Sequence, residues 1–162
     1  LTLNKKQIER FSRQIILKDI GAIGQKKIIK SKVLIIGMGG LGCPVAEFLA
    51  RAGVGSIGII DSDNVDLSNI HRQSLYDIND LKKSKVVAAK KKLKKINSEI
   101  KVRSYKIRLS KINYSKIIKE YDYIVDGSDN FKTKFLINDY CLKKKKILHS
   151  FALQNFTLFK KS

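Results

Sequence analysis

The sequence lacks the segments that a membrane-bound or secreted protein needs. No apolar run approaches the roughly 20 residues of a membrane-spanning helix, and the opening "LTLNKKQIERFSRQIIL" has no uninterrupted apolar stretch followed by a small-residue cleavage site. Tryptophan is absent and there is one proline. The 43% hydrophobic content over 162 residues is nevertheless enough for a folded core. We therefore expect a cytoplasmic protein in which residues 1–162 form one domain.

Cysteine is also scarce. Cys43 and Cys141 lie far apart in the sequence and do not form the C-x-x-C pairs of a structural zinc site. A disulfide between them would be unusual in the cytosol. We expect two buried or partly buried free thiols and no zinc site.

Acidic residues are few, and the charge is uneven. Residues 1–80 carry 11 basic and 8 acidic side chains, whereas residues 81–162 carry 23 and 6. Such a basic half can attract nucleic acid or an acidic protein. Most of its lysines, however, stand in helix-like runs such as "KKKLKK" without the interleaved aromatic residues on which single-stranded bases stack. A solvated surface is the favoured interpretation, and nucleic-acid binding stays open as a less favoured alternative.

Apolar strands alternate with amphipathic helices along the chain. The pattern predicts strands at 32–36, 56–61, 100–107, 121–127 and 147–151, and helices at 4–17, 22–30, 41–52, 80–96 and 131–143. The helix at 80–96 would bury a stripe made of Val86, Ala89, Leu93 and Ile96, with Asn79 or Asp80 as its N-cap. Residues 64–78 show no periodicity, as functional loops often do. This order predicts an α/β fold: a doubly wound, mostly parallel, Rossmann-like sheet preceded by two N-terminal helices.

The stretch "GMGGLG" joins the strand at 32–36 to the next helix. Gly37, Gly39 and Gly42 fit the G-x-G-x-x-G spacing, in which a tight turn lets a pyrophosphate rest on the helix N-terminus. Asp61 ends the second strand, 19 residues beyond Gly42, where dinucleotide folds place the acid that binds ribose hydroxyls. Together these features indicate an adenosine nucleotide. They do not distinguish a redox dinucleotide from a nucleotide that the protein cleaves.

Arg72, Lys85 and Asp129 bear on that choice. Nucleotidyl transfer needs cations around the phosphates and a carboxylate for magnesium, whereas hydride transfer needs an apolar slot. Each residue has an ordinary alternative: Arg72 as a surface loop charge, Lys85 as a helix boundary residue and Asp129 as a helix N-cap. Because the carboxyl ends of parallel strands line the ligand crevice, we expect the glycine turn, Asp61, the loop 68–73 and Asp129 to converge at one edge of the sheet.

Several motifs resemble the HesA/MoeB/ThiF family, the bacterial relatives of ubiquitin-activating enzymes. They are "RFSRQIIL" (10–17), "GMGGLGCP" (37–44), "DSDNVDLSNIHRQSLY" (61–76), the helix that begins near Lys85 and "YDYIVDGSDN" (121–130). The pair "SNIHRQ" and "GSDN" makes the resemblance specific. Within the family, the sequence most resembles the molybdopterin-synthase adenylyltransferases. The resemblance implies that ATP and Mg²⁺ are used to adenylate the C-terminal glycine carboxylate of a ubiquitin-like sulfur carrier protein, in molybdopterin or thiamine sulfur transfer.

The resemblance also implies roles for individual residues. Nucleotide binding would involve Gly37, Gly39, Gly40, Gly42, Asp61, Ser68, Asn69, Ile70, His71, Arg72, Gln73, Lys85, Asp129 and Asn130. The implied catalytic residues are Arg13, Arg72, Lys85 and Asp129, and Asp129 would also hold the magnesium ion. Arg13 resembles a family arginine that reaches into the neighbouring subunit's site, which implies a homodimer.

The sequence departs from the family pattern toward its end. The family continues past "SFALQNFTLF" into a carrier-binding half with two C-x-x-C pairs for zinc, and this sequence contains neither pair. Asn155 stands where the family usually has glycine, and "KKSK" replaces the "GQPK"-like segment before the lysine helix. Two alternatives therefore stay open: an ATP-binding module with impaired catalysis, and a tRNA-modifying member of the same superfamily.

Overall fold

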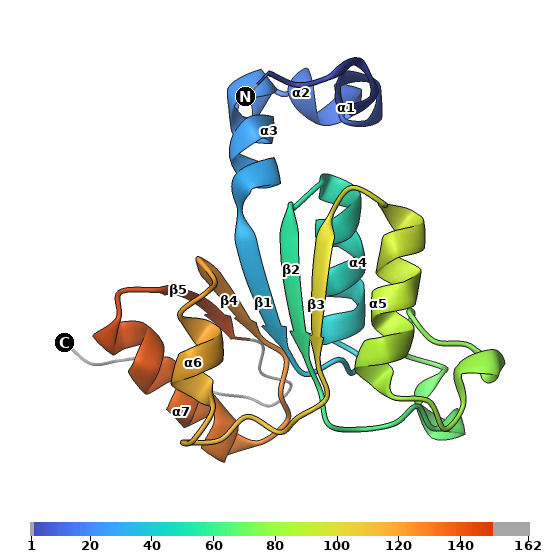
Figure 1. Cartoon of the computed structure of the whole chain (residues 1–162), viewed down its shortest axis with the longest axis vertical. Helices are drawn as coiled ribbons and strands as arrows, with labels where there is room; N and C mark the ends of the chain where they lie inside the picture. Colours follow the sequence, from blue (N-terminus) through green and yellow to red (C-terminus); the bar gives the residue numbers. More distant parts are fainter. Residues whose placement is uncertain (1, 151–162) are drawn as a thin grey trace.

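The structure, a computed structural model, describes residues 2–150 and is built on a five-stranded sheet (Figure 1). The strands are β1 (Lys32–Ile36), β2 (Ser56–Ile60), β3 (Lys101–Tyr105), β4 (Tyr123–Asp126) and β5 (Ile147–Ser150). Their order is β3-β2-β1-β4-β5, and every neighbouring pair is parallel. The predicted α/β fold and all five expected strands are confirmed, with ends that differ by one or two residues. Residue 151 lies outside the described residues.

Helices cover both faces of the sheet, as expected for a doubly wound fold. They are α4 (Gly42–Ala52), α5 (Lys85–Ile96), α6 (Tyr114–Ile118) and α7 (Phe131–Lys143). Successive residues of β1 face opposite ways, so Val33 and Ile35 join the core under α4 and α5, whereas Leu34 and Ile36 join the core under α6 and α7. Figure 1 shows these two helix pairs on opposite sides of the sheet. Helix α6, only five residues long, is an element that the sequence pattern did not predict.

Three short helices precede the sheet, where two had been expected. The segment predicted as one helix at 4–17 is split into α1 (Lys5–Arg10) and α2 (Ser12–Ile15), and α3 (Gly21–Lys30) follows. The split occurs at Phe11, whose backbone leaves the helical region and whose side chain is buried. Its ring lies so close to Gly53 that a Cβ there would stand 2.4 Å from it. Burial of this aromatic ring against Gly53 explains the break.

The connection after β2 also differs from the expectation. It holds two 3-10 turns, η1 (Leu67–Asn69) and η2 (Ile78–Asp80), and the long helix begins at Lys85 rather than at 80. Asp77 caps η2, and Lys82 has a positive φ of 66°, which no helix tolerates. Ser84 is therefore the N-cap of α5, and the expectation of Asn79 or Asp80 was wrong. The expected stripe is confirmed, since Val86, Ala89 and Leu93 are buried and Ile96 packs beside them.

Cys43 and Cys141 are both free and both buried, as predicted. No helix within residues 2–150 is long and apolar enough to cross a membrane.

Candidate functional site

The turn after β1 is too tight for side chains at two of its glycines. A Cβ on Gly42 would lie 1.9 Å from the Gly37 carbonyl oxygen, and a Cβ on Gly37 would lie 2.8 Å from the Gly127 carbonyl oxygen. Gly37 also has φ of 89°, a conformation that favours glycine. The second contact brings the loop after β4 against the loop after β1. This is the point where the strand order reverses, and open parallel sheets bind ligands there.

The turn leaves a row of backbone donors without acceptors. Cys43 N donates to Gly39 O at 3.0 Å, but the N–H groups of Gly39, Gly40, Leu41 and Gly42 donate to no atom of residues 2–150. No side chain caps the amino end of α4 either. Four unsatisfied donors at the positive end of an eleven-residue helix form a binding place for an anion.

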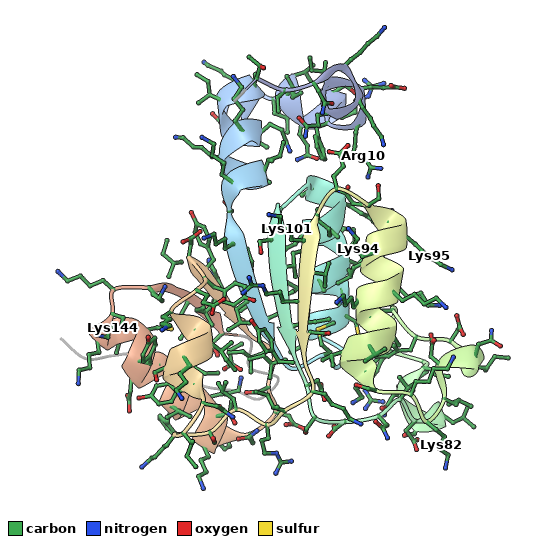
Figure 2. All side chains as sticks on the ribbon, in the orientation of Figure 1. Arg10, Lys82, Lys94, Lys95, Lys101 and Lys144 are labelled. Carbon is green, nitrogen blue, oxygen red and sulfur yellow. The ribbon has the colours of Figure 1, made fainter. Side chains whose placement is uncertain are left out.

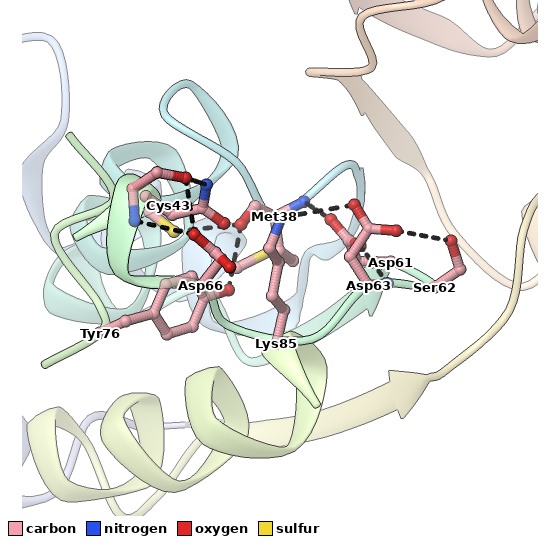
Figure 3. Close-up of polar contacts among 10 residues, drawn as sticks. Met38, Cys43, Asp61, Ser62, Asp63, Asp66, Tyr76 and Lys85 are labelled. Carbon is pink, nitrogen blue, oxygen red and sulfur yellow. Dashed lines mark hydrogen bonds and ion pairs between the residues drawn. The ribbon is translucent and has the colours of Figure 1, made fainter. Parts of the chain in front are cut away.

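Asp61 is fixed beside this turn by two backbone bonds (Figure 3). Its Oδ2 accepts from Met38 N and its Oδ1 accepts from Asp63 N, each at 2.8 Å. Each carboxylate oxygen has a second lone pair, so both can still accept a hydroxyl proton. The carboxylate of Asp61 is thus held at the glycine turn and retains acceptor capacity for a ligand.

Lys85 reaches the same edge from the first turn of α5. Its ammonium lies 3.5 Å from Asp63 Oδ2, and its backbone N–H donates to Asp63 O at 3.0 Å. The Lys85 side chain is 8% exposed, whereas that of Asp63 is 61% exposed. A buried ammonium with one long ion pair retains donors for a further anion. Asp63 was missed by the sequence reasoning, although it stands two residues after Asp61 in the same motif.

The loop 68–76 packs against the glycine turn. The Arg72 Cγ would lie 3.5 Å from a Cβ on Gly40, and the Gln73 Nε2 would lie 3.9 Å from a Cβ on Gly39. Gln73 is 3% exposed, and its Oε1 has no hydrogen-bond partner within the described residues. The structure therefore brings Arg72 and Gln73 to the turn, as predicted.

The rest of this loop is held by local bonds. Arg72 Nη1 donates to Ser68 O at 2.8 Å and lies 2.8 Å from His71 Nε2. The Ser68 hydroxyl and amide donate to the Asp66 carboxylate, which lowers the pKa of Asp66. Asn69 and Ile70 are half-buried at the end of η1. The guanidinium of Arg72 is therefore supported from its own loop and remains exposed.

The loop after β4 lies at the same edge of the sheet, on the other side of the glycine turn from Asp61. Asp129 is exposed and makes no hydrogen bond or ion pair with residues 2–150, whereas Asn130 Oδ1 accepts from Thr133 N at 2.9 Å and caps α7. The capping alternative for Asp129 is therefore wrong, and its carboxylate is available to a ligand.

Asp126, at the end of β4, was also missed. Its Oδ1 accepts from the Ser128 amide and hydroxyl, and its Oδ2 lies 3.1 Å from the Lys134 ammonium and 3.0 Å from the Ser150 hydroxyl. The side chain is 1% exposed, so it shapes the loop from inside rather than binding a ligand directly. An acidic residue closing a strand, as at Asp61, is the signal that could have identified it.

Arg13 does not join this edge within one chain. It is an exposed residue of α2, which Figure 1 shows beyond the amino ends of the strands, opposite the glycine turn. Its neighbour Gln14 donates to Ala52 O, at the carboxyl end of α4. The glycine turn thus has Asp61, loop 68–73 and the loop that carries Asp129 beside it, whereas Arg13 stands apart.

Known proteins are similar to this chain in sequence and in architecture. A model described as the ThiF family matches residues 11–157. "Adenylyltransferase and sulfurtransferase MOCS3" of Culex quinquefasciatus is 46% identical over 153 residues, 94% of this chain and 35% of that protein. "Sulfur carrier protein adenylyltransferase" of Thermus thermophilus is 42% identical over 135 residues, 83% and 50% respectively. The structure of E. coli tRNA N6-threonylcarbamoyladenosine dehydratase, TcdA, with AMP superposes with TM-score 0.87 at 25% identity, covering 93% of this chain and 61% of that one. The chain thus spans between a third and a half of the length of these two relatives.

Proposed function

The chain belongs to the ThiF family, and from that membership we propose that it binds ATP and activates a carboxylate as an acyl-adenylate. The proposed carboxylate is the C-terminal glycine of a ubiquitin-like sulfur carrier protein, serving molybdopterin or thiamine sulfur transfer. The names of the mosquito and Thermus relatives support adenylyl transfer, and the name of the second supports a sulfur carrier protein as the acceptor. The AMP complex of TcdA supports an adenine nucleotide on this fold.

One observation carries the proposal: four free N–H groups lie beside an oriented carboxylate at the switch point of the sheet. The amides of Gly39–Gly42 suit the phosphates, because they supply donors and the positive end of the α4 dipole. Asp61 suits the ribose, because its two oxygens are fixed and can each accept from a hydroxyl. A nucleotide laid across the carboxyl ends of β1 and β2 would therefore meet the amides with its phosphates and Asp61 with its ribose.

The proposed reaction needs positioning and charge stabilisation more than acid–base catalysis. A glycine carboxylate oxygen attacks the α-phosphorus, an O–P bond forms, and the bond from the α-phosphorus to the bridging oxygen breaks. Pyrophosphate leaves with the electron pair of that bond, and the acyl-adenylate remains. The nucleophile is already ionised, so no side chain has to remove a proton. Negative charge grows on phosphate oxygens, and fixed cations lower that barrier.

Arg72 and Lys85 are the cations that this chain brings to the turn. Arg72 can bind two phosphate oxygens with its planar guanidinium, and Asn69 stands beside it as a neutral donor. Lys85 would exchange its long contact to Asp63 for a phosphate oxygen. Arg13 can take part only from a second copy of the chain, so we propose that the active form is a homodimer.

Asp129 is the residue we propose for magnesium. Residues 2–150 hold no cluster of three His, Cys, Asp or Glu side chains that could hold a metal ion alone. Mg²⁺ suits such a place, because it commonly binds one or two carboxylates together with waters and substrate phosphates. When bound, it would neutralise charge on the triphosphate and on the departing pyrophosphate. Asp129, which is exposed and has no partner within residues 2–150, fits that donor set.

Exchange of radioactive pyrophosphate into ATP tests the function. The reaction contains the chain, Mg·ATP and a ubiquitin-like carrier that ends in glycine. Asp129→Ala should abolish carrier-dependent exchange without changing the unfolding curve. Asp139→Ala, which removes an exposed carboxylate from helix α7, just after the loop that carries Asp129, is the control and should retain exchange. ATP binding by the unaltered chain without exchange would instead indicate a nucleotide-binding module that has lost catalysis.

The basic half favours one second candidate, a tRNA-modifying enzyme like the structural neighbour TcdA. Figure 2 shows Lys82, Lys95 and Lys144 on separate parts of the molecule, which argues against a single basic groove for tRNA. A tRNA-binding assay at several salt concentrations distinguishes the two. A steep fall in log affinity with log salt, together with no exchange on any carrier, would favour tRNA.

A further inference from the structure

The peptide groups around Met38 are held from two sides inside the glycine turn. Tyr76 Oη donates to Met38 O at 3.0 Å, and Cys43 Sγ donates to the same oxygen at 3.4 Å. On the other side, Met38 N donates to Asp61 Oδ2 at 2.8 Å. Figure 3 shows Met38 between Tyr76 and Asp61. Tyr76 is 5% exposed, and Met38 and Cys43 are fully buried.

This arrangement supplies a rigidity that the turn itself lacks. Met38 stands between Gly37 and Gly39, and glycine backbones can rotate into conformations that other residues avoid. A rotation of the Met38–Gly39 peptide would turn the Gly39 amide, the first of the four free donors. Two donors on the carbonyl of that peptide oppose the rotation. The hydroxyl of Tyr76 is the stronger of the two, because a thiol is a weak donor.

We propose that Tyr76 is a positioning residue, which holds the Met38 carbonyl so that the amides of Gly39–Gly42 are presented to the phosphates of a nucleotide. The inference rests on the proposed binding of ATP at this turn. Tyr76 itself is too deeply buried to contact the nucleotide, so it acts through the backbone.

Both donors stay protonated in neutral solution. Burial raises the pKa of Tyr76 far above its ordinary value, and burial raises the pKa of the Cys43 thiol to about 11. A protonated hydroxyl and a protonated thiol can each donate to the carbonyl, whereas an ionised oxygen or sulfur would repel it. The two hydrogen bonds to the Met38 carbonyl are therefore kept throughout the neutral pH range.

Tyr76→Phe tests the inference, because it removes the hydroxyl and keeps the ring. Tyr121→Phe is a matched control: Tyr121 is 2% exposed, its hydroxyl lies 3.0 Å from the Tyr105 hydroxyl, and it packs on the opposite face of the sheet. Both variants should lower the melting temperature by similar amounts. In calorimetric titration with Mg·ATP, Tyr76→Phe should weaken binding about tenfold, the effect of losing one or two well-placed donors. Tyr121→Phe should change the Kd less than about twofold.

A second measurement needs no nucleotide. Amide hydrogen exchange of the free chain reports the bonds of Met38 N to Asp61 and of Cys43 N to Gly39 O. Protection of both should fall in Tyr76→Phe and not in Tyr121→Phe. Wild-type ATP affinity in Tyr76→Phe, or unchanged protection, overturns the inference, and so does an equal loss in both variants. If the unaltered chain binds ATP but shows no pyrophosphate exchange, the proposed function fails and this inference stands. If it binds no ATP, the proposed function and this inference both fail, because the inference requires a nucleotide at the turn.

Discussion

The two ends of helix α4 differ in how their backbone groups are satisfied. At the carboxyl end, side chains from distant segments fill the free carbonyls. Gln14 and Gln25 donate to Ala52 O at 3.3 and 3.0 Å, and Asn97 donates to Ala50 O at 3.1 Å. At the amino end, the N–H groups of Gly39–Gly42 have no acceptor within residues 2–150.

This difference separates a structural end of the sheet from a functional one. Helix ends normally find partners, since an unsatisfied buried group costs about 1–3 kcal/mol. Gln25 is fully buried for this purpose, and Asn97 is 1% exposed. A chain that caps one end with buried side chains and leaves the other open reserves the open end for a ligand. The variants below test whether the two ends can be altered independently.

Gly42→Ala should have the largest effect on stability, because it places a methyl group where two backbone segments of the glycine turn are in closest contact. The added Cβ would meet Gly37 O at 1.9 Å, and a backbone atom cannot move aside as a flexible side chain can. We expect a loss of about 3 kcal/mol or more in unfolding free energy, or failure to fold. Urea unfolding measures it. Gly40→Ala is the control, since its nearest neighbour would be the Arg72 side chain at 3.5 Å. Equal unfolding curves for the two variants would contradict the described turn.

Gln25→Ala should remove the buried amide that serves the closed end. The change breaks the bond to Ala52 O and the bond that Gln25 Oε1 accepts from Gln14 Nε2 at 3.0 Å, and it leaves a small cavity. We expect about 2 kcal/mol less unfolding free energy in urea. ATP affinity, measured by calorimetry on the folded variant, should stay within about twofold of the original. A large loss of affinity would show that the two ends are coupled.

The fold could be predicted where one local rule determines the structure. The core strand at 32–36 and the helix at 131–143 match the structure to the residue, because the strand ends where the glycine turn begins and the helix begins directly after its N-cap, Asn130. The helix expected at 4–17 failed at Phe11, whose burial depends on Gly53, far along the chain. Helix α6 was missed, because five residues are too few for a helical period to show.

The residues of the candidate site also divide into those that the sequence predicts and those that it does not. Asp61 and Asp129 follow strands, and parallel strands deliver their carboxyl ends to one edge, so their convergence followed from the fold class. Tyr76 and Asp126 instead contact residues that are distant in the sequence. The Tyr76 hydroxyl donates to the carbonyl of Met38, 38 residues away, and the Asp126 carboxylate accepts from the hydroxyl of Ser150, 24 residues away. Neither contact leaves a periodic trace in the sequence. The proposed role of Arg13 depends on a second copy of the chain, which no single fold contains.

Asp61→Asn should loosen the open end without removing any volume. An asparagine offers one acceptor oxygen, so either Met38 N or Asp63 N would face an NH₂ group instead. We expect about 1–2 kcal/mol less unfolding free energy and roughly tenfold weaker ATP binding. Asp122→Asn is the matched control at the other end of the sheet, where Asp122 Oδ2 accepts from Lys32 N at 3.1 Å. Its ATP affinity should be unchanged, and an equal loss in both variants would refute the distinction between the ends.

Cys43 should produce the smallest effect, one that depends on pH. The thiol sits in the first turn of α4, yet it is fully buried, and burial raises its pKa from 9.0 to about 11. Between these values the folded chain keeps a proton that the unfolded chain loses, so unfolding free energy falls as pH rises from about 9 toward about 11. Cys43→Ser keeps a donor for Met38 O and does not ionise. Urea unfolding at pH 8 and pH 10 should therefore show the original chain losing about 1 kcal/mol more than the variant. Equal losses would mean that water reaches the Cys43 thiol. Solvent would then enter the amino end of α4 more deeply than its exposed backbone amides.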